Sequence, residues 1–209
     1  MPLTPFVARE RESNILQSEW RSSDAKLLIL YGRRRVGKTR LMTHWIETAS
    51  PRALYWVAEP TSSKDQLRAF SQALFNFESS TTAPQDFSYS TWGQAFEQVA
   101  RMAKHDRFAL ILDEFTYLME LEQGIAGVLQ NAWDHHLKNS NVFLIVSGSH
   151  LGMMERGILA YQAPLYGRAT SKLLLQPLPF KATKGFFPKY RADERVALYS
   201  IFGGVPAYW

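Results

Sequence analysis

The 209-residue sequence contains no cysteine, which excludes disulfide bonds, thiolate zinc sites and a cysteine nucleophile. Long hydrophobic runs are also missing. The longest are Leu27–Tyr31, Phe108–Leu112 and Val142–Val146, far short of the roughly 20 residues that a membrane-spanning helix needs. The first residues show no apolar segment behind a basic head, so we expect no secretory signal. We therefore expect a soluble, cytoplasmic protein with no membrane partner.

The composition is that of an ordinary globular protein, with 46% hydrophobic and 21% charged residues. Lysine and arginine together number 24, against 19 aspartate and glutamate, so the formal net charge is +5. This excess is compatible with phosphate or nucleic-acid ligands, but it is too small to indicate either one by itself.

Short runs rich in branched and aromatic residues alternate with helical patterns along the chain. Runs of this kind, bounded by charge or glycine, are typical of strands buried on both faces of a parallel sheet. The alternation predicts an α/β fold built from strand–helix units. The expected strands are Leu27–Tyr31, Ala53–Val57, Phe108–Leu112, Val142–Val146 and Ser171–Gln176, and the expected helices between them are Thr39–Ala49, Lys64–Phe77, Thr91–His105 and Gly124–Lys138.

The pattern changes after Pro177, where two further helical stretches follow, Pro179–Phe187 and Arg191–Phe202. We therefore expect residues 1–178 to form the core and residues 179–209 to begin a helical lid segment. The chain stops two aromatic residues after a Gly-Gly-Val-Pro turn, and we interpret this end as a truncation rather than a natural terminus.

The first expected strand is followed by the pattern GxxxxGK[ST], formed by Gly32, Gly37, Lys38 and Thr39. The glycines let the backbone curl so that successive N–H groups face phosphate oxygens, and the following helix adds the positive end of its dipole. Lys38 can reach the β- and γ-phosphates, and the Thr39 hydroxyl can ligate Mg²⁺. Because the pattern joins an expected strand to an expected helix, it predicts a nucleotide phosphate site.

The remaining positions of this loop are basic or apolar. We assign them to the nucleotide-binding set, and the alternative for the three loop arginines is a solvated position without a ligand. These residues are Arg33, Arg34, Arg35 and Val36, together with Arg40 just after the loop.

The strand Phe108–Leu112 ends in two carboxylates, Asp113 and Glu114. Ligands in doubly wound sheets lie beyond the carboxyl ends of the strands, which places Asp113 beside the phosphate loop. There Asp113 can hold Mg²⁺ through its water shell, and Glu114 can activate a water for attack on the γ-phosphate.

Two further catalytic candidates follow later strands. Ser147, or alternatively Ser149, ends the strand Val142–Val146 and could sense the γ-phosphate, although a capping serine in a glycine turn would look the same. Arg168 is a candidate charge-stabilising arginine, in its own pocket or in that of a neighbouring subunit. A solvated arginine before a strand is the alternative interpretation.

Several segments taken together resemble the archaeal-type AAA ATPases, which are related to the STAND and origin-recognition ATPases. The resemblance implies the sheet order 5-1-4-3-2 and ATP or ADP as ligand. It also implies that Phe6, Val7 and Arg9 lie over the adenine, and that Pro206 packs near the nucleotide. The family usually has glycine where this chain has Ala8. The matching segments are FVARE (6–10), YGRRRVGKTRL (31–41), LDEFTYL (112–118), SGSHLGMM (147–154), PLYGR (164–168) and GGVPAYW (203–209).

The favoured function is a Mg²⁺-dependent ATPase that acts as a switch or motor for a partner. The alternative is a nucleic-acid-binding module in which ATP is a structural or regulatory ligand with little turnover. Duplex DNA, through C-terminal domains that the family usually carries, and further copies of the chain are the expected partners. A GTPase is excluded, because Thr183-Lys184 is followed by Gly185-Phe186 and not by the guanine-reading aspartate.

Overall fold

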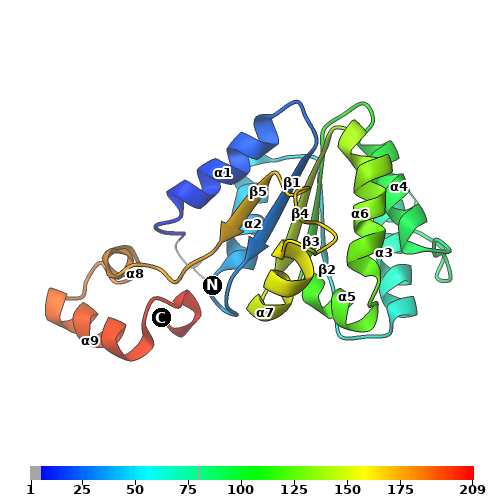
Figure 1. Ribbon diagram of the computed structural model, residues 1–209. Coiled ribbons are helices and arrows are strands. Elements are labelled where there is room, and N and C mark those ends of the chain that lie inside the picture. Colours follow the sequence, from blue (N-terminus) through cyan, green and yellow to red (C-terminus); the bar gives the residue numbers. More distant parts are fainter. Residues whose placement is uncertain (1–5, 80) are drawn as a thin grey trace.

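A five-stranded parallel sheet forms the centre of the computed structural model, which describes residues 6–79 and 81–209 (Figure 1). The strand order is β2-β3-β4-β1-β5, which is the expected order 5-1-4-3-2 read from the other edge. Each neighbouring pair runs parallel, so the predicted fold class is confirmed. The strands are β1 (Lys26–Tyr31), β2 (Ala53–Val57), β3 (Phe108–Asp113), β4 (Val142–Gly148) and β5 (Ser171–Leu174).

Both faces of the sheet are covered, which explains why its central strands are continuous apolar runs. Along β1, Leu28 and Leu30 point into one hydrophobic cluster, whereas Leu27 and Ile29 point into another on the opposite face. The strands β3 and β4, in the middle of the sheet, are buried at every residue. The strands β1, β2, β3 and β4 therefore each contribute side chains to two cores.

Helices on the two faces complete a three-layer α/β/α arrangement. Leu16 of α1 and Leu41, Met42 and Trp45 of α2 belong to the first cluster, and the other helices pack on the opposite face. Some of the helices begin at a side-chain cap: Ser62 accepts from Asp65 N, Thr91 accepts from Gln94 N and His150 accepts from Met153 N. The helices are α1 (Glu10–Arg21) and α2 (Lys38–Ala49) on one face, and α3 (Ser63–Glu78), α4 (Trp92–Met102), α5 (Phe115–Leu121), α6 (Ile125–His135) and α7 (Leu151–Met154) on the other.

The chain after β5 forms α8 (Thr183–Phe186), α9 (Ala192–Phe202) and a final 3-10 turn, Pro206–Tyr208. Figure 1 shows α8 and α9 extending away from the sheet, while the C-terminal turn folds back toward it. The return is fixed by Leu178, whose N–H donates to the carbonyl of Gly204 at 2.6 Å. No helix within the described ranges is long and apolar enough to cross a membrane.

Candidate functional site

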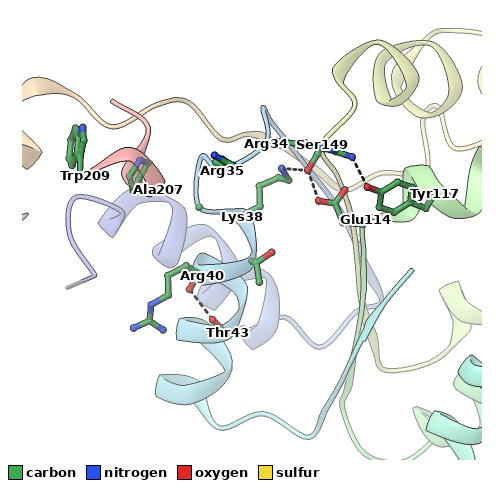
Figure 2. A pocket seen from close by; sticks show the side chains of 13 residues that line it. Arg34, Arg35, Lys38, Arg40, Thr43, Glu114, Tyr117, Ser149, Ala207 and Trp209 are labelled. Atoms are coloured by element: carbon green, nitrogen blue, oxygen red, sulfur yellow. Dashed lines mark hydrogen bonds between the residues drawn. The ribbon is translucent and has the colours of Figure 1, made fainter. Parts of the chain in front are cut away.

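A cavity of about 910 Å³ lies at the edge of the sheet where β1, β3 and β4 end. The loop between β1 and α2 forms one wall, and side chains that follow β3 and β4 form another. The C-terminal turn closes it from a third side, through Pro206, Ala207 and Trp209 (Figure 2). Segments distant in the sequence therefore meet around one cavity.

The loop between β1 and α2 has the backbone that its glycines predict. Gly32 and Gly37 have φ values of 159° and 102°, and Arg35 also has a positive φ, of 66°. A Cβ on Gly32 would lie 2.6 Å from the carbonyl oxygen of Leu175, so only glycine fits there. The 12-residue helix α2 begins at Lys38, so its N-terminal end faces the cavity. The loop therefore presents a surface suited to anions.

Lys38 is 5% exposed, and its ammonium group has three hydrogen-bond partners. It donates to the carbonyl oxygens of Gly32 at 2.9 Å and Arg33 at 3.2 Å, and to Ser149 Oγ at 2.8 Å. Burial lowers the pKa of Lys38, while the negative charges of Glu114 and Asp113 oppose that shift. This is a buried cation held at the floor of the cavity.

Asp113 is 1% exposed, and its carboxylate accepts hydrogen bonds at both oxygens. Thr39 Oγ1 donates to Oδ2 at 2.9 Å, and the backbone N–H of Glu114 donates to Oδ1 at 2.9 Å. The hydroxyl of Tyr55 also donates to Oδ2, at 2.5 Å, and burial together with the charge of Asp113 raises the pKa of Tyr55 above its ordinary range. Hard oxygen atoms of this kind could hold Mg²⁺.

Glu114 is the first residue after β3 and has a left-handed backbone, with φ of 52°. Ser149 Oγ donates to its Oε1 at 2.5 Å, which links Lys38, Ser149 and Glu114 in one chain of hydrogen bonds (Figure 2). The other oxygen, Oε2, is buried and has no hydrogen-bond partner among the described residues. A buried carboxylate oxygen without a donor is suited to accept a hydrogen bond from a water molecule.

Residues 6–208 match a family described as an ATPase domain predominantly from Archaea. The chain belongs to this family. An uncharacterized protein of Methanocaldococcus jannaschii is 33% identical over 203 residues, which are 97% of this chain and 43% of that protein. An uncharacterized ATP-binding protein of the same organism is 50% identical over 42 residues, 20% of this chain and 71% of that protein. The ATPase domain thus spans less than half of the longer relative.

Solved structures with the same fold include a Walker-type ATPase of Pyrococcus abyssi, with a TM-score of 0.66 and 20% identity over 96% of this chain and 65% of that one. A STAND protein with a tetratricopeptide-repeat sensor from Pyrococcus horikoshii has a TM-score of 0.61 and 18% identity, and the match covers 99% of this chain and 30% of that one. The ORC1 protein of Aeropyrum pernix, in complex with DNA, has a TM-score of 0.60 and 16% identity, and the match covers 93% of this chain and 50% of that one. At these identities the likeness shows the fold, and together with the family match it confirms the resemblance to AAA-type ATPases.

In this ATPase domain the two serine candidates have different surroundings. Ser147 lies inside β4, opposite Leu30 of β1, and is fully buried; its Oγ has no hydrogen-bond partner in the part of the chain that the structure describes. Ser149, two residues later, lines the cavity and contacts Lys38 and Glu114. The structure therefore brings the second candidate, and not the first, to the acidic pair.

Arg168 does not lie at the cavity of the ATPase domain. It precedes β5, at the edge where the strands begin, and forms an ion pair with Asp134 near the end of α6. Its Nε lies 3.0 Å from Oδ1 of Asp134, and Nη2 lies 2.7 Å from Oδ2. The hydrogen bond from Arg168 lowers the pKa of Asp134. The geometry gives Arg168 a structural partner and no contact with the phosphate loop of its own chain.

The loop arginines divide into two groups. Arg34 and Arg35 line the cavity, and Arg40 lines it from the first turn of α2. Arg34 donates to the hydroxyl of Tyr117 at 2.5 Å, whereas the exposed Arg33 borders a separate surface hollow. Val36 is buried in the core beneath the loop and contributes its carbonyl oxygen to Arg9.

A small apolar cavity of about 60 Å³ adjoins the loop and shares Gly37, Arg40 and Pro206 with the main cavity. The ring of Phe6 stacks on His44 with centroids 3.7 Å apart, and the guanidinium of Arg40 lies 5.8 Å from the same ring. Arg9 is held by hydrogen bonds to the carbonyl oxygens of Val36 and Gln176. The lining of this small cavity includes Phe6, Val7 and Arg9, which the resemblance places over the adenine, and also Arg40 and Pro206 of the expected nucleotide-binding set.

Several side chains of the site were not singled out in the sequence, among them Tyr55, Tyr117 and Trp209. Tyr55 lies on the edge strand β2 and donates a hydrogen bond to Asp113, and Tyr117 lies on α5 and accepts a hydrogen bond from Arg34. Trp209 lines the cavity from the last position of the chain. Tyr117 and Trp209 lie in segments that carry the family resemblance, but the sequence does not reveal the contacts of these three residues, because each depends on a tertiary contact between separate elements.

Proposed function

We propose that this ATPase domain binds ATP with Mg²⁺ and hydrolyses the β–γ phosphoanhydride bond. One observation supports the proposal most directly: the chain of hydrogen bonds from Lys38 through Ser149 to Glu114 faces the same cavity as Thr39, whose hydroxyl bonds to the buried Asp113 directly behind it. A phosphate-binding cation, two candidate metal-binding oxygens and a candidate general base thus lie together.

Binding would use the loop amides and Lys38. The Lys38 ammonium would exchange its contacts with the loop carbonyls for β- and γ-phosphate oxygens, which stabilise its charge better. Arg34, Arg35 and Arg40 add positive charge around the cavity, and this charge favours a polyanionic ligand.

Thr39 and Asp113 fit Mg²⁺, because both supply hard oxygen atoms and the Asp113 carboxylate is already oriented by three donors. When bound, Mg²⁺ supplies charge neutralisation on the β- and γ-phosphates. The residues of this chain would hold it through the Thr39 hydroxyl and through the water shell facing Asp113.

Glu114 would act as the general base. Its unpartnered Oε2 can accept a hydrogen bond from a water molecule, and Ser149 holds Oε1 so that the carboxylate cannot rotate freely. As the water oxygen attacks the γ-phosphorus, its proton passes to Glu114, and the bond to the β-phosphate oxygen breaks to release ADP.

A pair of variants tests this assignment. Lys38→Ala should abolish binding of a fluorescent ATP analogue, whereas Glu114→Gln should retain binding and reduce phosphate release by about 10²- to 10⁴-fold. Lys64→Ala and Glu120→Gln, at exposed positions on α3 and α5 outside the cavity, are the matched controls. Unchanged hydrolysis by Glu114→Gln would contradict the role of Glu114, and unchanged binding by Lys38→Ala would contradict the site itself.

The wider role that we propose is that of a switch or motor for a partner, with residues 179–209 as the beginning of a lid. Duplex DNA is one candidate partner, supported by the net charge of +5 and by the DNA complex of the A. pernix neighbour. A salt-dependent affinity for duplex DNA that differs between ATP and ADP would support this role. If the protein does not bind duplex DNA at low salt, DNA is excluded as its partner. If it binds ATP with negligible turnover, the alternative function is favoured, in which ATP is a structural or regulatory ligand.

Arg168 stays a proposed charge-stabilising residue only for the pocket of a neighbouring copy. Its ion pair with Asp134 lies at the opposite edge of the sheet from its own phosphate loop, so reaching a γ-phosphate requires a second chain.

A further inference from the structure

The carboxylate of Asp113 accepts three hydrogen bonds, and one of the three donors belongs neither to the phosphate loop and its helix nor to the acidic pair. Thr39 occupies one oxygen at 2.9 Å, and the backbone of Glu114 occupies the other at 2.9 Å. The third donor, at 2.5 Å, is the hydroxyl of Tyr55, which belongs to the edge strand β2. Neither the phosphate-loop motif nor the acidic pair accounts for this tyrosine.

The register of the sheet brings Tyr55 to this position. In the β2–β3 pair, Tyr55 lies opposite Ile111, and Val57 lies opposite Asp113. Tyr55 and Asp113 are therefore diagonal neighbours on the same face, at a spacing that only a long side chain can bridge. Its ring packs against the cluster that contains the core residues of α2, the helix that carries Thr39. The hydroxyl is thereby directed at the same Oδ2 atom that Thr39 contacts.

This contact restricts the rotation of the carboxylate. With Thr39 alone on Oδ2, the group could turn about its Cβ–Cγ bond and exchange its two oxygens. A second donor on Oδ2 and the backbone donor on Oδ1 leave one orientation favoured. Partners of this kind orient metal-binding groups without touching the metal, and their loss typically costs 10- to 100-fold in metal affinity.

We propose that Tyr55 is a positioning residue for divalent-cation binding, which orients Asp113 and does not itself contact the nucleotide. The inference rests on the proposed function, because it takes Asp113 as part of the Mg²⁺ site. Neither Tyr55 nor Asp113 belongs to the lining of the main cavity, and Tyr55 is connected to the lining residue Thr39 through their shared contact with Asp113.

Tyr55→Phe isolates the hydroxyl, because it keeps the ring and its packing. We expect about tenfold weaker Mn²⁺ binding, measured by electron paramagnetic resonance with a non-hydrolysable ATP analogue present. In EDTA, the affinity of Tyr55→Phe for the same analogue should equal that of the unsubstituted chain. Tyr89→Phe, on the segment between α3 and α4 and away from the cavity, makes the same chemical change and should leave both affinities unchanged.

A second variant separates orientation from packing. Tyr55→Leu removes the hydroxyl and the ring together, so a role of the hydroxyl predicts the same loss of Mn²⁺ affinity in both variants. A loss seen only with leucine would overturn the proposal in favour of packing, and unchanged Mn²⁺ affinity in Tyr55→Phe would also overturn it. If the unsubstituted chain fails to bind the analogue at all, the failure belongs to the nucleotide site and not to Tyr55.

Discussion

At the scale of single residues, the backbone of Ala8 is strained. Its φ of 57° lies in the left-handed region, which costs a residue with a Cβ about 1–2 kcal/mol. The next residue, Arg9, is anchored to the carbonyl oxygens of Val36 and Gln176, so the chain cannot relax by moving away. The resemblance to the archaeal-type AAA ATPases implies glycine at this position, and glycine has no such cost.

Ala8→Gly should therefore stabilise the protein. We expect the free energy of unfolding to rise by about 0.5–1 kcal/mol, because the relief of strain exceeds the entropy that glycine adds to the unfolded chain. Urea denaturation followed by tryptophan fluorescence measures the change. The control, Ala69→Gly at an exposed position inside α3, should lower the same quantity by about 1 kcal/mol. A destabilised Ala8→Gly variant would show that the anchored segment, and not the side chain, determines this φ.

Residues in local motifs could be located from the sequence, whereas residues in tertiary contacts could not. Lys38 and Thr39 follow from the loop pattern, Asp113 and Glu114 follow from the end of an apolar run, and the structure brings all four together. The choice between Ser147 and Ser149 depended on where β4 ends, and the strand runs two residues past the apolar run. Tyr55 depends on the register of β2 against β3, which the sequence does not reveal.

At the scale of elements, the strands were the most predictable part. Burial on both faces makes each central strand a continuous apolar run, and β2 was predicted with its observed bounds. The observed bounds of α2 and α3 lie within one residue of those expected. The expected helices 91–105 and 124–138 were too long, because the chain leaves the α-helix after Met102 and His135.

Three helices were not predicted, each for a physical reason. α1 is mostly polar and buries only Leu16 fully, so its apolar stripe is too narrow to stand out. α5 has seven residues and begins at Phe115, and the preceding Glu114 provides no side-chain cap. α7 has four residues, fewer than a periodicity needs. The strand order was likewise not readable from these patterns, and it came from the family resemblance.

At the scale of the whole molecule, the cavity joins the core to the end of the chain. Pro206, Ala207 and Trp209 form one wall of the cavity whose floor is Lys38. The guanidinium of Arg35 lies 5.6 Å from the centroid of the Tyr208 ring, which adds a second contact between the loop and the terminal turn. Binding of a ligand in this cavity would therefore depend on the terminal segment as well as on the phosphate loop.

Gly204 attaches that segment to the core and offers a test of this dependence. A Cβ on Gly204 would lie 1.9 Å from the carbonyl oxygen of Leu178, and the N–H of Leu178 donates to the carbonyl of Gly204 at 2.6 Å. Gly204→Ala must therefore displace the terminal turn from the core, and we expect about fivefold weaker binding of a fluorescent ATP analogue, equivalent to about 1 kcal/mol of lost wall contacts.

ATP should also protect residues 179–209 from limited proteolysis in the unsubstituted chain and fail to do so in the Gly204→Ala variant. Gly124→Ala, where a Cβ would meet no atom within 4 Å, is the control and should bind normally. Equal affinity of Gly204→Ala and the unsubstituted chain would mean that the phosphate loop and the acidic pair bind the nucleotide without the terminal segment.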